Sequence, residues 1–192
     1  PLPATRTFVP QPRAVEAENV DDHPSPSQIR TVMYPSSFYV LERLRYGVAL
    51  PDVVALDWEA RLFSHLNDWG YKILHKPHPA SRTLPPTGFT EAFGGTMLTQ
   101  RFEDVMHLAD IFIFVHPQSS PFITIMASGK PAVFVDLGLV QWEPAAYAML
   151  ARRCSVVKGW VDDENRVRVD WDDLRIALEE CRRLNDPIFF DS

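Results

Sequence analysis

Two short polar motifs in this sequence combine side chains that bind phosphate. The motif KPHP (76–79) follows the apolar run YKILH, and the motif HPQSS (116–120) follows IFIFV. Lys76 and His78 can donate hydrogen bonds as cations, and Ser119 and Ser120 can donate through their hydroxyl groups. A helix that begins at the serines would add the positive end of its dipole. These residues predict a phosphate site, with His116 as a candidate second contact.

The elements that precede the two motifs must bring them together. From residue 31 onward, short apolar runs alternate with amphipathic patterns, which is typical of a parallel sheet with crossover helices. We expect strands at 31–37, 71–75, 111–115, 132–135 and 155–157, and helices at 57–70, 101–109, 120–129, 144–153 and 172–183. This order predicts an α/β fold built on an open doubly wound parallel sheet. Such sheets bind ligands beyond the carboxyl ends of their strands, where both motifs fall.

Several polar residues are expected to start helices. Asp57 and Ser120 are predicted N-caps, and Pro121 is predicted to occupy the first helical position after Ser120. Asp170 and Asp172 match an Asp-x-Asp metal motif, but capping of the last helix explains them better. The sequence also lacks a His/Cys cluster with the spacing of zinc ligands. We therefore expect no metal site.

Composition and charge exclude several classes of protein. The 192 residues carry a net charge of −6 without a basic block, which argues against nucleic-acid binding. No apolar run approaches the ~18 residues that span a membrane. The cysteines Cys154 and Cys181 form no disulfide framework, so we expect a reducing cytoplasm. Residues 1–30 hold six prolines and are predicted to be a linker or arm, and the start at Pro1 suggests a fragment.

A further candidate group follows the predicted strand at 132–135. Gln141 and Glu143 could contact a ribose or a sugar, as the acidic residue of dinucleotide sites does. Glu143 could equally be a glutamate favoured at a helix start, just before Pro144. Trp142 could stack on a ligand, although a place in the core is more common for tryptophan. Lys76 likewise has a solvated alternative, because lysines often follow strands into solvent.

Three segments together resemble a known group of proteins: KPHP (76–79), HLADIFIFVHPQSS (107–120) and SGKPAVFVD (128–136). The sequence is similar, over residues 31–184, to the C-terminal, nucleotide-binding half of bacterial glycosyltransferases with the two-lobed B fold. The capsule and teichoic-acid group is nearest, with its CDP-glycerol glycerophosphotransferases and its CMP-Kdo and CMP-sialic acid transferases. Glycerophosphotransferases usually show Thr-Asp-Tyr before the serine pair. This chain has His116-Pro117-Gln118 there, which favours CMP-sugar users.

The resemblance implies a function and a set of roles. Residues 31–192 would be a nucleotide-sugar donor-binding domain, in which His78, Ser119 and Ser120 contact the cytidylate phosphate. No metal or other cofactor would be required. A second α/β lobe upstream would supply the catalytic base, so no catalytic residue is assigned here. The partners would be a nucleotide sugar, most simply a CMP-sugar such as CMP-Kdo, and a glycan acceptor, with peripheral association at the inner face of the membrane.

Two alternatives to a glycosyltransferase remain open at this point. One is a sugar-nucleotide epimerase of the same two-lobed fold. The other is a module without enzymatic activity that binds a nucleotide or a partner. The two motifs at strand ends distinguish the binding functions from a purely structural domain, which has no need of them.

Overall fold

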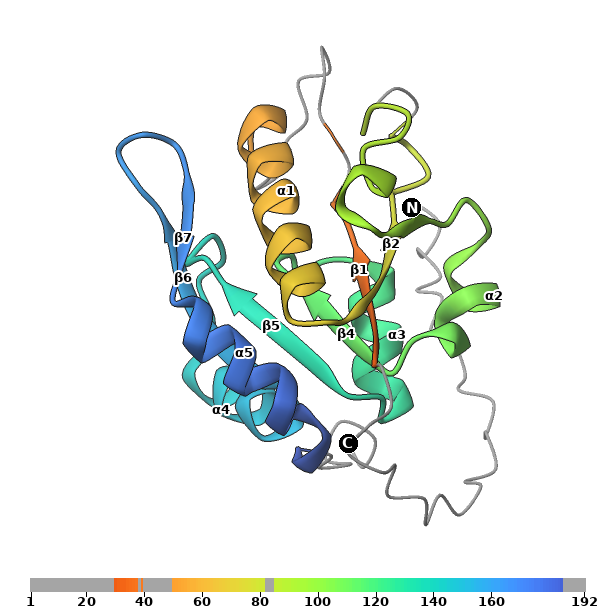
Figure 1. Cartoon of the computed structure of the whole chain (residues 1–192). Helices are drawn as coiled ribbons and strands as arrows, with labels where there is room; N and C mark the ends of the chain where they lie inside the picture. Colours follow the sequence, from red (N-terminus) through yellow and green to blue (C-terminus); the bar gives the residue numbers. More distant parts are fainter. Residues whose placement is uncertain (1–29, 38, 40–49, 82–84, 185–192) are drawn as a thin grey trace, which may run out of the picture.

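The fold is a seven-stranded sheet covered by helices on both faces (Figure 1). The computed structural model describes residues 30–37, 39, 50–81 and 85–184, so the expected arm, apart from Arg30, lies outside the described residues. The strands are β1 (Thr31–Pro35), β2 (Lys72–Lys76), β3 (Thr96–Met97), β4 (Ile111–Phe114), β5 (Ala132–Asp136), β6 (Ser155–Val161) and β7 (Val167–Val169). Their order is β3-β2-β1-β4-β5-β6-β7, and every pair is parallel except β6–β7. The predicted doubly wound α/β fold is confirmed, with a Rossmann-like strand order.

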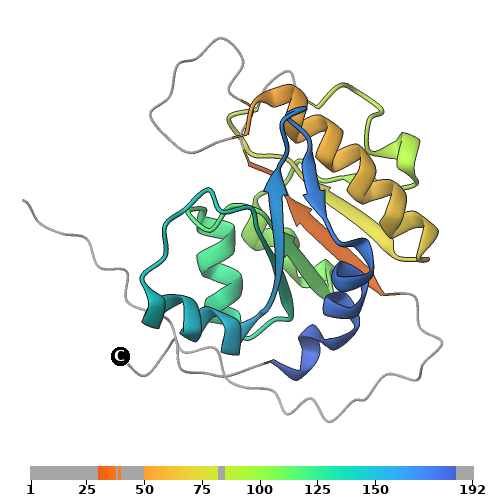
Figure 2. The same cartoon turned by 90° about the vertical axis from the view of Figure 1, so that its left-hand side faces the viewer.

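The helices form two layers on opposite faces of the sheet. They are α1 (Asp52–Asp68), α2 (Phe102–Val105), α3 (Ser120–Ser128), α4 (Pro144–Arg153) and α5 (Trp171–Glu180), with 3₁₀ turns η1 (Glu91–Phe93), η2 (Met106–Leu108) and η3 (Cys181–Arg183). Helices α1 and α5 pack into one apolar core, and α2, α3 and α4 pack into the other. Figure 2 shows α1 and α5 on one side of the strands and α3 and α4 on the other.

The strand residues alternate between these two cores. In β1, Val32 faces the core formed with α1 and α5, whereas Met33 faces the core formed with α2, α3 and α4. Both are fully buried, as expected for parallel strands covered on both faces. In the second core, the ring centroids of Phe114 and Phe122 lie 5.3 Å apart in a T-shaped arrangement. This contact fixes the start of α3 against the end of β4.

Helix α1 begins at Asp52, five residues before the start that the sequence pattern predicted. Pro51 is its N-cap residue, and the predicted N-cap, Asp57, lies inside the helix. The Asp57 carboxylate accepts hydrogen bonds from Arg61 and from Arg166 on the β6–β7 hairpin. The cap prediction was wrong because Val54 extends the buried face N-terminally, and the carboxylate found cationic partners instead of backbone N–H groups.

One short strand and two helix ends also differ from expectation. Strand β3 was not predicted, because a run of two residues gives too little alternation to recognise. The polar strand that the sequence pattern places just before Asp170 is β7. The helix expected at 101–109 is a four-residue α2 followed by η2, and the last predicted helix ends as α5 followed by η3. The positive φ of Asn165 closes the hairpin that folds β7 back antiparallel to β6.

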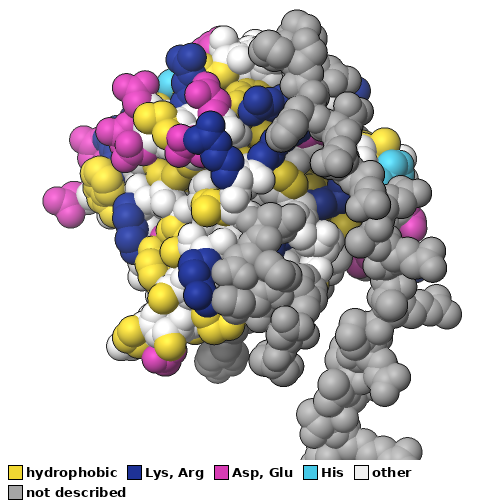
Figure 3. Space-filling view, turned by 90° about the horizontal axis from the view of Figure 1, so that it is seen from below, with side chains coloured by type: hydrophobic (Ala, Val, Ile, Leu, Met, Phe, Trp, Pro, Cys, Tyr) yellow, Lys and Arg dark blue, Asp and Glu magenta, His cyan; other side chains and the backbone are white. Residues whose placement is uncertain are grey.

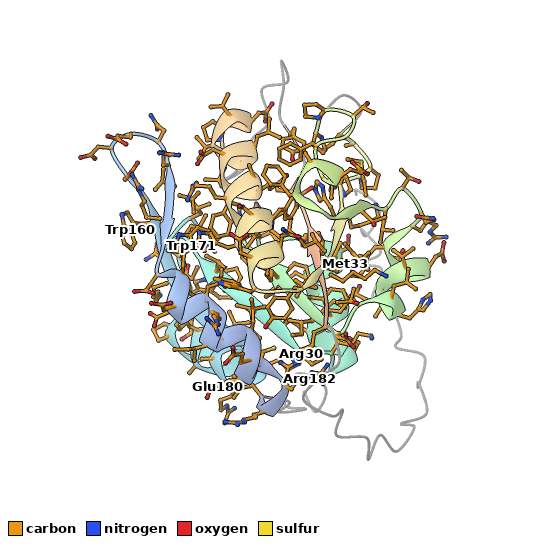
Figure 4. The ribbon with its side chains drawn as sticks, viewed as in Figure 1. Arg30, Met33, Trp160, Trp171, Glu180 and Arg182 are labelled. Carbon is orange, nitrogen blue, oxygen red and sulfur yellow. The ribbon has the colours of Figure 1, made fainter. Side chains whose placement is uncertain are left out.

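The strand order creates a switch point between β1 and β4. The chain leaves β1 toward α1 and β2, and it leaves the neighbouring β4 toward α3 and β5 on the opposite face. The carboxyl ends of these two strands therefore border a crevice, the usual ligand site of such sheets. Figure 4 shows Arg30, which directly precedes β1, at the lower end of the molecule, so the carboxyl ends lie at the upper end. Figure 3 views the lower end, where Lys and Arg side chains lie among acidic and apolar ones without forming a continuous basic surface.

Candidate anion-binding cleft

A cleft of about 360 Å³ lies at the carboxyl ends of β1, β2 and β4. Five of the residues predicted to bind phosphate line it: Lys76, His78, His116, Ser119 and Ser120. Residue Pro35 of β1 pairs with Lys76 of β2, and β1 also pairs with β4, so the three strand ends are neighbours. The structure thus brings the KPHP and HPQSS motifs to one cleft at the switch point.

Lys76 places a nearly buried cation in this cleft. The residue is 6% exposed, and its Nζ donates a hydrogen bond to the carbonyl oxygen of Pro77 at 2.9 Å. No carboxylate of the described residues lies within ion-pair distance of Nζ. Burial lowers the pKa of Lys76, and the nearest carboxylate influence, from Glu103, opposes that shift. A buried ammonium with one neutral acceptor has unused donors and an uncompensated charge, which an anion in the cleft would satisfy.

The two histidines of the motifs are held by similar local bonds. The backbone N–H of Ala80 donates to Nδ1 of His78 at 3.1 Å, and that of Gln118 donates to Nδ1 of His116 at 3.3 Å. Because Nδ1 accepts in each ring, the proton of the neutral ring resides on Nε2. Both side chains therefore present an N–H donor even when uncharged, which suits an anionic ligand.

The cap of α3 is Ser119, and the prediction that Ser120 caps this helix was wrong. Ser119 Oγ accepts a hydrogen bond from the backbone N–H of Phe122 at 3.3 Å and donates one to the carbonyl oxygen of His116 at 3.4 Å. Ser120 is the first helical residue, so Pro121 is second, not first. The backbone angles of Ser119 are extended, as an N-cap requires, and those of a helix start follow at Ser120.

This arrangement determines which serine hydroxyl group at the start of α3 can donate a hydrogen bond to a ligand. The hydroxyl group of Ser119 already donates and accepts within the protein. Ser120 is exposed at the cleft wall, and its hydroxyl group and backbone N–H have no acceptor among the described residues. Pro121 lacks an N–H, and that of Phe122 is capped. Of the first three residues of α3, Ser120 is therefore the one with available donors.

Gln141 and Glu143 lie outside the cleft. Neither residue lines it, although both follow β5 as expected. Glu143 is the N-cap of α4, and its Oε2 accepts a hydrogen bond from the backbone N–H of Ala146 at 2.9 Å. Glu143 thus has the role at a helix start that the sequence offered as the alternative to a ribose or sugar contact. Trp142 packs against Phe134 with ring centroids 5.9 Å apart, which gives it a place beside the core.

Three cleft residues were not assigned a site role from the sequence. Ser36 and Ser37 follow β1 directly, and Arg101 precedes α2. The two serines had a recognisable signal, since they end a strand that the parallel order places beside the HPQSS strand. Arg101 had none, because its place depends on the loop between β3 and α2. Its guanidinium lies 3.8 Å from the Glu103 carboxylate and is mostly exposed.

Comparisons with known proteins assign this chain to no family. The sequence matches no family model and no curated protein. Among solved structures, the chain is similar to an imine reductase from Myxococcus stipitatus, a V8 variant in complex with NAD+, at 16% sequence identity and a TM-score of 0.37. The similarity covers 69% of this chain and 39% of that enzyme, so the chain spans well under half of the enzyme's length.

Neither a membrane-spanning helix nor a metal-binding cluster is found among the described residues. None of the described helices is long and apolar enough to cross a membrane. Within the same residues, no group of three or more His, Cys, Asp or Glu side chains is placed to hold a metal ion.

Proposed function

We propose that this chain is the donor-binding lobe of a glycosyltransferase that uses a cytidine nucleotide, most simply a CMP-sugar. The observation that carries the proposal is the nearly buried Lys76 ammonium, which faces a cleft at the switch point without a carboxylate partner among the described residues. An anionic ligand is the simplest counterion for it. The cytidine assignment rests on the resemblance of the KPHP and HPQSS motifs to CMP-sugar transferases.

The chemistry of such a lobe would be electrostatic stabilisation of a leaving group. When the bond between the sugar and the CMP phosphate breaks, negative charge grows on the phosphate oxygens. Lys76, the Nε2–H of His78 and the donors of Ser120 would stabilise that charge. The acceptor would be a glycan. The base that deprotonates it would come from a second lobe.

A dinucleotide cofactor fits this chain less well. Dinucleotide sites of this topology need a glycine-rich turn between the first strand and the first helix. The sequence between Ser36 and Asp52 contains a single glycine, Gly47. The serines and the KPHP turn would instead receive a phosphate through side chains, which suits a mononucleotide donor.

Isothermal titration with CMP, AMP and cytidine tests the proposal. We expect CMP to bind more tightly than AMP, and cytidine to bind weakly because it lacks the phosphate. Lys76→Met should weaken CMP binding by about tenfold or more, since a hydrogen bond to a charged group contributes ~1.5–3 kcal/mol. Lys72→Met is the matched control, because Lys72 begins the same strand at the opposite end and is exposed. Equal affinity for all three ligands, or none, would favour a module without donor-binding activity.

A further inference from the structure

A set of buried polar side chains lies directly behind the cleft. Ser36, Glu59, His75 and Thr90 are 7%, 1%, 0% and 0% exposed, and Ser36 also lines the cleft. His75 joins them, because its Nδ1 lies 2.7 Å from Thr90 Oγ1 and its Nε2 lies 3.3 Å from Ser36 Oγ. The direction of these two hydrogen bonds decides where the hydroxyl proton of Ser36 points.

The bond to Thr90 fixes the first direction. Thr90 is completely buried, and His75 Nδ1 is the partner of its hydroxyl group among the described residues. If Nδ1 carried the ring proton, the Thr90 hydroxyl proton would have no acceptor among the described residues at this fully buried position, which is costly. The favoured arrangement has Thr90 donating to Nδ1, so the proton of the neutral ring resides on Nε2. Burial lowers the pKa of His75 to about 3, so the ring stays neutral at ordinary pH.

The position of Glu59 selects the same arrangement independently. Glu59 Oε2 lies 3.7 Å from His75 Nε2, on the side of the ring that faces Ser36. The hydroxyl group of Tyr39 donates a hydrogen bond to the same oxygen, so a proton held by the Glu59 carboxyl group resides on the other oxygen and Oε2 presents a lone pair to Nε2. A protonated Nε2 is attracted to that oxygen, whereas an unprotonated Nε2 would place two lone pairs against each other.

With Nε2 protonated, His75 donates to Ser36 Oγ, and the Ser36 hydroxyl proton is left to point elsewhere. Among the described residues, the cavity that Ser36 lines is the cleft. We propose that Ser36 is a hydroxyl donor to the phosphate in this cleft and that His75 is the positioning residue that turns its proton toward the ligand. This inference rests on the proposed function, because it takes phosphate as the ligand of the cleft.

The proposed contact adds a hydroxyl donor to those of Ser120 at the start of α3. The hydroxyl group of Ser119 is engaged by His116 and Phe122 within the protein. Ser36 lies at the end of β1, between the ends of β2 and β4 that carry Lys76 and Ser120. Phosphate would then receive donors from three adjacent strand ends. The same geometry argues against Ser36 as a nucleophile, which would need an unprotonated Nε2 to accept its proton.

The ring proton of His75 can be located directly by nitrogen NMR of the full chain with labelled histidine. We expect a one-bond proton correlation at Nε2 and an unprotonated Nδ1, unchanged between pH 6 and 8. Glu59→Gln identifies the ring among the other histidines, because it changes the group beside Nε2. A proton on Nδ1 would overturn the proposal, because Ser36 would then donate to His75 and have no proton for a ligand.

Ligand binding gives the second test. Ser36→Ala should weaken CMP binding by about tenfold, as loss of a hydrogen bond to a charged group does, and should leave cytidine binding unchanged. Ser155→Ala is the matched control, because Ser155 is similarly buried but lies at the amino end of β6, away from the carboxyl strand ends that form the cleft. His75→Leu should show the same selective loss, and His75→Gln should restore most of it, because the glutamine amide can donate to Ser36.

The outcomes separate this inference from the proposed function. If the parent chain binds CMP and Ser36→Ala binds it equally well, Ser36 is no donor and the inference fails alone. If the parent binds neither CMP nor inorganic phosphate, both fail together. Covalent labelling of Ser36 by a fluorophosphonate would also overturn the inference, because it would show Ser36 acting as a nucleophile.

Discussion

The hydroxyl oxygen of Ser119 lies 3.3 Å from the backbone nitrogen of Phe122 and caps the first turn of α3, the helix that begins at the cleft. Ser119→Ala should therefore lower the free energy of unfolding by about 1 kcal/mol, the usual contribution of an N-cap. Urea denaturation measures this directly. Ser120→Ala is the comparison, since Ser120 is exposed and should lose less than ~0.5 kcal/mol. Equal losses in the two variants would contradict the cap assignment.

Arg153 fixes the other end of α3. Its guanidinium, 1% exposed, donates hydrogen bonds to the carbonyl oxygens of Ile125, Met126 and Lys130 at 2.8–2.9 Å. Lysine keeps the charge but cannot reach three carbonyl groups with one ammonium. Arg153→Lys should cost about 2–4 kcal/mol of stability, measured by urea denaturation.

The control for this substitution is Arg175→Lys, which changes an exposed arginine paired with Glu179. Such a surface replacement should stay within about 0.5 kcal/mol of the parent. A parent-like stability for Arg153→Lys would mean that the carbonyl groups at the end of α3 find other donors.

Glu59 makes the stability of the fold depend on pH. Burial raises the pKa of Glu59 from 4.5 to about 8, and the hydrogen bond from Tyr39 opposes this shift. The folded state therefore holds a proton that the unfolded state has released above pH 5. Stability falls as pH rises toward 8, by at most about 1.4 kcal/mol per pH unit. His75 acts in the opposite direction but contributes at most about 0.4 kcal/mol above pH 6.5, because its ring is half protonated in the unfolded state at that pH.

The measurement is urea denaturation from pH 6.5 to 8. The parent should lose stability across this interval, whereas Glu59→Gln should stay level, because its amide accepts from Tyr39 without titrating. An identical slope in both proteins would show that Glu59 is ionised in the folded state throughout.

The five central strands and their parallel arrangement with crossover helices could be predicted, because buried parallel strands have a plain signature. The run IFIFV (111–115) is apolar at every position, and four of its residues form β4 between two cores. The convergence of the KPHP and HPQSS motifs followed from the parallel order alone. A feature could be predicted wherever the residues of a single strand or helix determine it.

The errors arose where partners distant in sequence decided the structure. The Asp57 side chain had the right type for an N-cap, but Arg166, 109 positions away, paired with it instead. Whether Ser119 or Ser120 caps α3 depends on a difference of one residue that the sequence pattern does not resolve. The link from Thr90 through His75 to Ser36 joins three separate segments. No spacing rule connects those segments.

Gly95 offers a way to perturb this link from outside the cleft. A Cβ at Gly95 would lie 2.8 Å from Thr90 Cγ2 and 3.1 Å from Ile73 Cγ2, which is closer than such atoms approach. Ile73 is held in β2 by the sheet, whereas Thr90 lies in a turn before η1, so we expect Thr90 to shift. Gly95→Ala should cost about 1–3 kcal/mol of stability by overpacking and should displace Thr90 from His75.

Two measurements check this prediction against Gly88→Ala, where a Cβ meets nothing within 4 Å and the positive φ alone imposes strain of about 1–2 kcal/mol. Thermal denaturation should show losses in both variants. The NMR signal of His75 Nε2–H should shift or broaden in Gly95→Ala and stay parent-like in Gly88→Ala. Because the bond from His75 orients Ser36, CMP binding should weaken in Gly95→Ala as well. An unchanged His75 signal in Gly95→Ala would show that Ile73, not Thr90, yields to the added methyl group.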